Sequence, residues 1–450
     1  MIHRYKQGDL HIVLDINSGA VHVVDELAFN MLGLLTPPLK KNLPHDLPGS
    51  LSGYENDEIH DTYNELYELY LSGELFSEDD YQSIGKLTEI SPVKALCLHI
   101  AHDCNMRCEY CFASTGEYHG GRSLMSEEVG FKAIDYLIEK STGRRNLEVD
   151  FFGGEPLMNF EVVKKVVKYA RSKEELHDKV FRFTITTNGL LLDDDKTDFI
   201  NSEMSNVVLS IDGRKEVNDR VRKRVDGSST YDNIVGKFKS LVDKRGDKPY
   251  YARGTFTKYN LDFVDDVLAL SKLGFDQISV EPVVADIKEP YAITTADLEK
   301  INREYEKLAD IMVDLQDNRD WFNFFHYMID LEQGPCAIKR LRGCGCGNEY
   351  VAVTPEGDVY PCHQFVGHSE WKMGSVFDGS IDMKMKKMFA DSTVYGKEEC
   401  KNCWAKFYCS GGCNANAMIY NGDIKKPHQI SCELEKKRIE CALYIKAKTI

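Results

Sequence analysis

The sequence predicts an α/β protein built around a parallel sheet, with a small α+β module before the sheet and a cysteine-rich segment after it. Between residues 92 and 285, short β-rich runs alternate with amphipathic helical patterns, as parallel α/β architectures require. The expected strands are VKALCLHI, LEVDFFG, FRFTITT, VVLSI, YARGTFT and QISVEPV. A chain of 450 residues exceeds one ordinary domain, and we expect domains at 1–88, 92–310 and 311–450.

The expected first module begins with a hairpin. Residues 10–24 contain two β-rich runs around the turn sequence NSG. A helical pattern follows Asp25, which is a suitable N-cap, and a second helical pattern ends at Gly73. A hairpin followed by helices makes a small α+β unit.

Composition and charge exclude several classes of protein. With 42% hydrophobic and 28% charged residues, the chain resembles ordinary globular proteins, and no run approaches the ~18 apolar residues of a membrane span. The N-terminal sequence lacks the features of a secretory signal, so we expect a cytoplasmic protein with no membrane role. In that reducing compartment, fourteen cysteines favour metal ligands or catalytic groups over disulfides. A net charge of −16 argues against binding to nucleic acid.

The most informative cysteines are Cys104, Cys108 and Cys111, which form a CxxxCxxC run. They are too close together for disulfides, and their spacing differs from that of an ordinary zinc hairpin. A [4Fe–4S] cluster has four irons and prefers four thiolates, so a triplet leaves one iron open for a ligand. On spacing alone, zinc binding and chance remain the alternatives.

Polar or glycine-containing segments follow each early strand at its carboxyl end, which is where parallel barrels place their active sites. These segments are the cysteine loop, the GGEP sequence at residues 153–156, Asn188 with Gly189, and Asp212 with Gly213.

The CxxxCxxC run, followed by GGEP after a strand, resembles the signature of the radical S-adenosylmethionine (SAM) enzymes. The resemblance implies that the amino and carboxylate groups of SAM chelate the open iron. It also implies that the reduced cluster cleaves SAM to a 5′-deoxyadenosyl radical, which removes hydrogen from a substrate. The middle block as a whole resembles the partial (β/α)6 TIM-like barrel of that family.

The same resemblance assigns cofactor-binding roles to five residues. Gly154 and Glu155 match the motif that holds the amino group of SAM, and Tyr110 is the aromatic residue before the third cysteine. Ser210 lies at the fourth strand, and Arg222 follows it as a candidate bidentate partner of the SAM carboxylate. The structural alternative is that Ser210 merely ends a strand and Arg222 is a surface charge.

The cysteines after residue 343 resemble the SPASM or twitch-like extension of radical SAM enzymes, which carries two auxiliary [4Fe–4S] clusters. With the SAM-binding cluster, this implies three clusters. The resemblance implies that one cluster has four ligands, which are Cys400, Cys403, Cys409 and Cys432. The other cluster has three ligands, which are Cys344, Cys362 and Cys413. The second set leaves an open iron that a substrate thiolate could occupy, unless Cys346 or Cys336 fills it.

His363 follows Cys362 at a position where formylglycine-forming relatives have an Asp. This difference weakens formylglycine formation as the function of this chain. We expect His363 either to accept a proton in catalysis or to make a hydrogen bond near the cluster. Glu281 and Asp358 are weaker candidates for an acid.

The first module resembles the winged-helix-like domains that bind leader peptides as an added strand. The whole chain most resembles the SCIFF maturases, which are related to sactipeptide synthases and modify cysteine-rich ribosomal peptides. The resemblance implies an oxidoreductase that joins a cysteine sulfur to a carbon of another residue. Its partners would be a cysteine-rich precursor peptide with a leader and a low-potential electron donor such as flavodoxin or ferredoxin.

Two alternatives remain from the sequence. One is a different radical SAM modification of a peptide or protein, such as dehydrogenation, epimerisation, carbon–carbon crosslinking or formylglycine formation. The other is a non-catalytic iron–sulfur electron carrier, which would leave GGEP, Ser210 and Arg222 unexplained.

Overall fold

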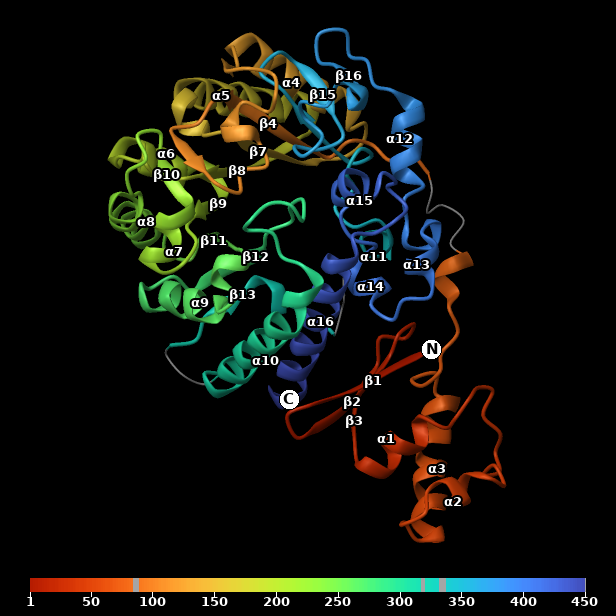
Figure 1. Ribbon diagram of the computed structural model, residues 1–450. Helices are drawn as coiled ribbons and strands as arrows, with labels where there is room; N and C mark the ends of the chain where they lie inside the picture. Colours follow the sequence, from red (N-terminus) through yellow and green to blue (C-terminus); the bar gives the residue numbers. More distant parts are fainter. Residues whose placement is uncertain (84–88, 317–319, 332–336, 450) are drawn as a thin grey trace.

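The computed structural model describes residues 1–83, 89–316, 320–331 and 337–449. The N-terminal module lies to one side of the molecule, and the strands of the middle region form an open arc (Figure 1). The C-terminal region lies on the open side of that arc, and its last helix runs back toward the N-terminal strands (Figure 1).

The N-terminal module contains an antiparallel sheet with the order β1-β2-β3. Its strands are β1 (Ile2–Gln7), β2 (Leu10–Asp15) and β3 (Val21–Val24). The predicted hairpin is therefore confirmed as β2 and β3, and β1 is a further strand that the sequence pattern did not reveal. The helices are α1 (Glu26–Leu32), α2 (Leu47–Ser50) and α3 (Asn56–Leu71). Asp25 caps α1 as expected, because its side chain accepts a hydrogen bond from the amide of Ala28.

The middle region is a parallel sheet in which neighbouring strands follow one another in chain order. The strands are β4 (Ala95–His102), β7 (Asn146–Gly153), β8 (Val180–Thr187), β9 (Met204–Ser210), β11 (Tyr250–Phe256) and β12 (Gln277–Pro282). All the strands expected from the sequence are present, and they confirm the α/β class and the partial parallel barrel. The strand β4 is buried along its whole length, which explains its continuous apolar sequence.

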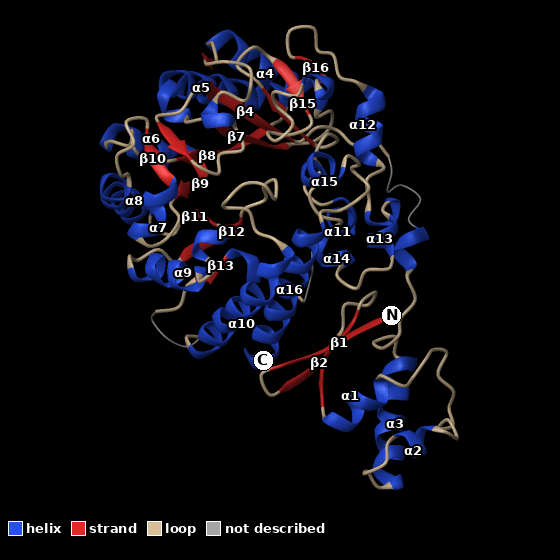
Figure 2. Ribbon diagram, in the orientation of Figure 1, coloured by secondary structure: helices blue, strands red, loops and turns tan. Residues whose placement is uncertain are grey.

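Helices connect these strands and cover the outside of the arc (Figure 2). They are α4 (Glu127–Lys140), α5 (Phe160–His177), α6 (Asp194–Glu203), α7 (Lys215–Val221), α8 (Tyr231–Arg245), α9 (Phe263–Lys272) and α10 (Leu298–Asp314). Their apolar sides pack on the sheet; in α5, for example, Val163, Val166 and Ala170 are fully buried. This burial along one helical face stabilises the arrangement that brings the strand ends together.

The C-terminal region extends the same sheet. Strand β14 (Tyr350–Val353) pairs in parallel with β4, and β15 (Asp358–Tyr360) and β16 (Gly374–Ser375) continue the sheet in antiparallel pairing. At the opposite edge, β13 (Asn323–Phe324) pairs in parallel with β12. Beside this pairing, Cys346 and Cys362 lie in one buried cluster with Cys97 of β4, and Cys111 packs against that cluster.

Three short strands complete the middle region: β5 (Met106–Cys108), β6 (Ser123–Leu124) and β10 (Arg222–Arg224). Strands β5 and β10 pair with each other, and Arg222 is the register partner of Cys108.

The C-terminal helices are α11 (Ala337–Arg342), α12 (Met383–Ala390), α13 (Glu398–Lys401), α14 (Lys406–Cys409), α15 (Asn414–Asn421) and α16 (Gln429–Thr449). Helix α16 packs against α10 and reaches the N-terminal module, where Tyr5 Oη donates a hydrogen bond to the carbonyl oxygen of Glu440. Among the described residues, no helix combines the length and the apolar character that a membrane span needs.

Candidate active site

A cavity of about 150 Å³ lies at the carboxyl ends of the parallel strands. All eight residues that the sequence assigns to the SAM-binding cluster and to SAM line this cavity: Cys104, Cys108, Tyr110, Cys111, Gly154, Glu155, Ser210 and Arg222. They come from the cysteine loop and from the ends of different strands, so the fold alone brings them together.

Gly154 allows the end of β7 to approach the cysteine loop closely. A Cβ atom at this position would lie 2.1 Å from the carbonyl oxygen of Asp103, a contact that only glycine avoids. The adjacent amide of Glu155 donates to the same oxygen at 2.9 Å. The GGEP sequence therefore holds β7 against the loop that carries the cysteines.

Glu155 is 1% exposed, and its carboxylate accepts three hydrogen bonds. The donors are the amide of Leu157 at 3.1 Å, Thr187 Oγ1 at 2.8 Å and the amide of Asn188 at 2.8 Å. Burial raises the pKa of Glu155 to about 7, and these hydrogen bonds oppose the shift. The carboxylate is thus held in one orientation beside the cysteines, with unused acceptor capacity for a donor such as an amino group.

Asn188 is a site residue to which the sequence analysis assigned no role. Its side-chain nitrogen donates to Asn105 Oδ1 at 2.8 Å and lies 3.6 Å from Cys104 Sγ. In the sequence, the feature that could have indicated a role for Asn188 is its position directly after β8, at the same edge of the sheet as the other site residues.

Arg222 is 9% exposed, so it is not a surface charge. Its Nε atom lies 3.0 Å from Asp212 Oδ1 in an ion pair, and its Nη1 atom lies 4.0 Å from Cys108 Sγ. Asp212 also accepts a hydrogen bond from Tyr110 Oη at 2.6 Å. From the sequence, Asp212 was expected only as part of a polar segment after a strand, yet its carboxylate joins the two predicted cofactor-binding side chains.

The donor set of the cavity fits SAM. Arg222 Nε makes its ion pair without forming a hydrogen bond to the described residues, so the guanidinium retains donors for a carboxylate. Glu155 provides a fixed acceptor for an amino group, and the three cysteines line the same cavity.

The thiols of this cavity fit an iron–sulfur cluster better than a single ion. Burial raises the pKa of Cys104 to about 12 and that of Cys108 to about 11, so both thiols lose their protons on binding a metal. Over residues 1–83, 89–316, 320–331 and 337–449, no three His, Cys, Asp or Glu side chains are grouped as ligands of one metal ion. A cluster binds each thiolate at a different iron and therefore requires a wider set.

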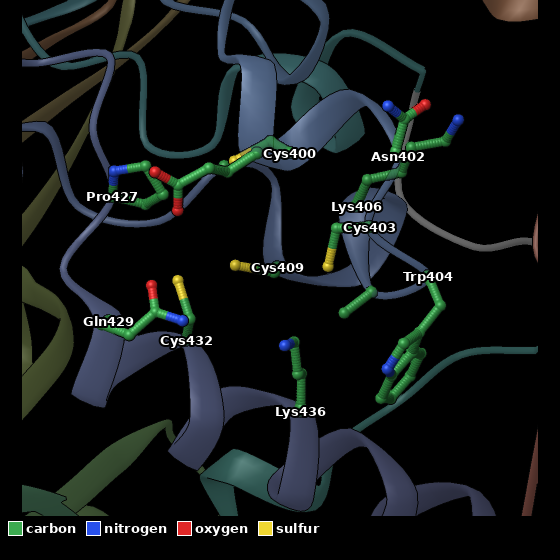
Figure 3. A pocket seen from close by; sticks show the side chains of 13 residues that line it. Cys400, Asn402, Cys403, Trp404, Lys406, Cys409, Pro427, Gln429, Cys432 and Lys436 are labelled. Carbon is green, nitrogen blue, oxygen red and sulfur yellow. The ribbon is translucent and has the colours of Figure 1, made fainter. Parts of the chain in front are cut away.

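A second group of cysteines surrounds a cavity of about 310 Å³ in the C-terminal region. Its members are the four cysteines that the SPASM resemblance groups together: Cys400, Cys403, Cys409 and Cys432. They come from α13, the segment after it, α14 and α16. Figure 3 shows the sulfur atoms of Cys403, Cys409 and Cys432 directed into the cavity.

The third group contains the predicted Cys344, Cys362 and Cys413, together with Cys346. Burial raises the pKa of Cys413 to about 11, and the negative charges of Cys362 and Cys344 act in the same direction, which places the three near one another. A hydrogen bond between Cys346 and Cys362 raises the pKa of Cys346 and lowers that of Cys362. Cys336, the other candidate for the open position, lies outside the described residues.

His363 is half-buried, and it is not among the residues that line the SAM cavity. Its Nδ1 atom lies 3.2 Å from Tyr350 Oη, and its ring contacts Phe152 with a centroid distance of 5.1 Å. Burial lowers the pKa of His363 to about 4, with the positive charge of Arg253 adding to the shift, so the imidazole is neutral at pH 7.

The weaker candidates form ion pairs. Glu281 pairs with Arg253 at 2.9 Å, and Asp358 pairs with Lys372 at 2.7 Å. Burial favours the neutral form of Glu281, but the positive charge of Arg253 and its neighbours lowers its pKa to about 2. Glu281 is therefore ionised at pH 7 and has no proton to donate as an acid.

Two known iron–sulfur families match this chain. Residues 94–234 match the family described as a 4Fe-4S single cluster domain. Residues 344–404 match the SPASM family, described as an iron-sulfur cluster-binding domain.

Characterised relatives cover most of the chain. It is 24% identical over 455 residues to the radical SAM cyclopropyl synthase TigE of Paramaledivibacter caminithermalis, covering 93% of this chain and 89% of that protein. It is 25% identical over 334 residues to a cysteine-type anaerobic sulfatase-maturating enzyme of Clostridium novyi, covering 70% of this chain and 86% of that protein.

Solved structures share the fold. The enzyme anSMEcpe with bound AdoMet, which is SAM, superimposes with a TM-score of 0.67 at 22% identity, covering 80% of this chain and 96% of that chain. SuiB of Streptococcus suis bound to its precursor peptide SuiA gives a TM-score of 0.52 at 17% identity, covering 95% of this chain and 98% of that chain. The N-terminal part of a parallel α/β barrel thus matches one iron–sulfur family and the cysteine-rich C-terminal region another. Together these similarities support a radical SAM protein with a C-terminal SPASM domain, whose cofactors are SAM and [4Fe–4S] clusters.

Proposed function

We propose that this protein is a radical SAM oxidoreductase that forms a thioether between a cysteine sulfur and a carbon of another residue in a ribosomally made, cysteine-rich precursor peptide. The observation that carries the proposal is the third cysteine group: the negative charges of Cys344 and Cys362 raise the pKa of Cys413, and Cys362 lies in a buried cluster against which Cys111 packs. Three thiolates on a cluster of four irons leave one position for a substrate thiolate.

In this proposal the three groups of cysteines hold three clusters. Cys104, Cys108 and Cys111 hold the cluster that binds SAM, and Gly154, Glu155, Tyr110, Ser210 and Arg222 hold SAM itself. The remaining two groups, as described above, hold the auxiliary clusters. When bound and reduced, the SAM-binding cluster supplies a deoxyadenosyl radical that removes hydrogen from a carbon of the peptide.

Cys346 is proposed to remain a thiol rather than to become the fourth ligand. Ligand sulfurs bind different irons at separate corners of a cluster, whereas Cys346 is hydrogen-bonded to the sulfur of Cys362. As a donor to that sulfur, Cys346 stabilises its negative charge. The fourth iron then stays available to a substrate cysteine, whose proton leaves on binding.

The reaction removes two electrons and two protons from the peptide. The radical takes one hydrogen atom from carbon, and the thiol loses one proton as it binds to iron. When the sulfur and the carbon radical combine, one electron remains, and a cluster held by Cys344, Cys362 and Cys413 would supply an acceptor for it. His363 is proposed to receive the thiol proton, because its imidazole is neutral at pH 7.

The N-terminal module is proposed to bind the leader of the precursor peptide. In its sheet β3 is an edge strand, and Val23 on that strand is 52% exposed. An extended peptide can pair with such an edge through backbone hydrogen bonds. SuiB, which matches this chain over 95% of its length, was solved with a precursor peptide, and this supports a peptide substrate.

A second candidate reaction is carbon–carbon bond formation within a peptide. It is favoured by the similarity to the cyclopropyl synthase TigE, which extends over 93% of this chain. Both reactions use the same radical and differ in whether a sulfur or a carbon captures it, so only the product separates them. Formylglycine formation, the alternative raised by the sulfatase-maturating relative, is less favoured because His363 stands at the position of the proposed base.

The test is an anaerobic assay of the protein reconstituted with iron and sulfide. SAM, reduced flavodoxin or ferredoxin and a cysteine-rich precursor peptide are added, as the reducing cytoplasm would supply them. A thioether gives a peptide lighter by about 2 Da per bond that no longer reacts with a thiol-alkylating reagent. The same mass loss with every cysteine still alkylated would exclude the thioether and leave carbon–carbon bond formation or dehydrogenation, which fragmentation of the product would separate. Intact clusters that yield neither deoxyadenosine nor a changed peptide would contradict the enzyme proposal and favour an electron carrier.

A further inference from the structure

Lys397 is a buried cation between the two C-terminal cysteine groups. It is 1% exposed, and it immediately precedes α13, which carries Cys400. Its own carbonyl oxygen accepts a hydrogen bond from the amide of Cys400 at 3.0 Å. The residue is therefore attached by its backbone to a predicted ligand of the four-cysteine group.

The side chain of Lys397 reaches the loop that joins the two groups. Its Nζ atom donates to the carbonyl oxygen of Gly411 at 2.7 Å and to Asn414 Oδ1 at 2.9 Å. Gly411 lies midway between Cys409, which belongs to the four-cysteine group, and Cys413, which belongs to the other. The ammonium group is thus placed at the boundary between the two groups.

The charge of Lys397 has no carboxylate partner among the described residues. Both acceptors of its hydrogen bonds are uncharged oxygens. Burial lowers the pKa of Lys397, and the negative groups that oppose this shift are Cys400, Cys409, Cys413 and Cys432, which come from both groups. A buried cation without a counter-charge is costly, and anionic clusters on both sides would supply that counter-charge.

We propose that Lys397 is a shared electrostatic partner of both auxiliary clusters and that its positive charge raises their reduction potentials. The inference rests on the proposed function, since it assumes that both cysteine groups hold [4Fe–4S] clusters. A cluster becomes more negative by one charge on reduction, so a fixed cation beside it stabilises the reduced form.

This role matters for the proposed reaction because one electron must leave the peptide as the carbon–sulfur bond forms. The substrate radical and the thiolate are together oxidised by one electron, and the adjacent auxiliary cluster is reduced by one. A second cluster, held by Cys400, Cys403, Cys409 and Cys432, would supply a path for the electron to the oxidised flavodoxin or ferredoxin. A cation between the two clusters favours the acceptance of the electron by either of them.

The test uses the full-length chain with Cys104, Cys108 and Cys111 replaced by Ala, so that only auxiliary clusters contribute to the signal. Midpoint potentials are measured by redox titration monitored by electron paramagnetic resonance. K397M should lower the equilibrium constant for reduction of each cluster at least tenfold, which corresponds to about 59 mV for one electron. K397R, which keeps the charge, should stay within about threefold of the parent, by the same conversion.

Asn414→Asp provides a second variant that leaves the lysine in place. Asn414 is 8% exposed and already accepts hydrogen bonds from Lys397 and from Ser392 Oγ, so Asp fits without new packing. Its negative charge would neutralise the lysine, and both potentials should fall as in K397M. Lys386, a buried lysine on α12 that is 5% exposed, gives the matched control K386M, which should change neither potential.

Iron and sulfide contents are measured first on the parent and on each variant. If K397M loses its clusters, the midpoint potentials of N414D test the role of the Lys397 charge instead. Full clusters with unchanged potentials in N414D and K397M overturn the inference alone, and a shift in one cluster only overturns the shared role. A parent that holds no auxiliary clusters overturns the proposed function and this inference together.

Discussion

Arg222 and Asp212 form a buried ion pair, with Arg222 Nε 3.0 Å from Asp212 Oδ1 and the Asp212 side chain fully buried. The same carboxylate accepts the hydroxyl of Tyr110 at 2.6 Å and the amide of Thr255 at 2.9 Å. Asp212 is thereby anchored to β11 and holds Arg222 toward the cysteines. Asp212 is not among the residues that line the SAM cavity, so in the proposed function it is a positioning residue that acts through Arg222 and Tyr110.

We predict that D212N weakens SAM binding at least tenfold, a loss of about 1.4 kcal/mol, because Arg222 loses its charged partner. The measurement is SAM affinity of the reconstituted protein by isothermal titration calorimetry. D266N is the matched control, since Asp266 is equally buried and pairs with Arg214 at 2.8 Å outside the SAM cavity. Equal losses of affinity in both variants would show that Asp212 acts only through general stability.

The raised pKa of Glu155 predicts a pH dependence for SAM binding. With a pKa of about 7 before SAM binds, the carboxyl holds a proton below pH 7 and must release it to accept the amino group of SAM as a carboxylate. SAM affinity should therefore fall by up to about tenfold per pH unit below 7 and level off above it.

The comparison variant for this pH dependence is E155Q, which carries no titrating proton at that position. Its affinity should be about 10-fold or more below that of the native protein at pH 8, because a hydrogen bond to a charged group is lost. The ratio of native to E155Q affinity should shrink as the pH falls from 8 to 6. A ratio that stays constant would mean that Glu155 does not titrate on binding.

The proposed state of Cys346 can be tested by iron analysis. C344A should lose the cluster of the third group, about four irons per chain, because a ligand is removed. C346A should keep that iron, because only a hydrogen bond to Cys362 is lost. If C346A loses as much iron as C344A, Cys346 is a ligand, and no open iron remains for a substrate thiolate.

His363 should affect bond formation but not SAM cleavage, since it lies outside the residues that line the SAM cavity. We predict that H363Q lowers the rate of product formation about 10²-fold or more, as expected for loss of a general base. Deoxyadenosine should still form. Y350F, which removes the hydroxyl 3.2 Å from His363 Nδ1, should give a smaller loss in the same direction. A decrease of deoxyadenosine in parallel with product would place His363 in SAM binding instead.

The exposed edge of β3 predicts where the leader binds. V23D places a charge on a side chain that is 52% exposed at that edge, and it should weaken the binding of a fluorescent leader peptide about tenfold. Leu176, which is 76% exposed on α5, provides the control L176D, which should leave leader affinity unchanged. Native affinity in V23D would mean that the leader binds elsewhere.

Local patterns were sufficient to predict the strands, whereas the residues of the SAM cavity were predicted from the resemblance to the radical SAM enzymes. Each strand of the barrel is a short apolar run, and the buried face of such a run depends mainly on its own sequence. The GGEP sequence was readable as a motif that follows a strand, and the structure supplies its reason, because only glycine at residue 154 avoids the carbonyl oxygen of Asp103. Parallel strands then bring such strand-end residues to one edge without further information.

The roles of Asp212, Asn188 and Lys397 were decided only by the tertiary structure. Tyr110 is 102 residues from Asp212 in the chain, and Asn188 Nδ2 reaches the sulfur of Cys104 across 84 residues. Lys397 resembles any other lysine in the sequence, and only burial beside two cysteine groups gives its charge a role. The sequence by itself determined which residues can bind cofactors, because ligand chemistry belongs to the side chain. Their partners and charges depend on folding, because electrostatic and hydrogen-bonding interactions act over distances in space rather than along the chain.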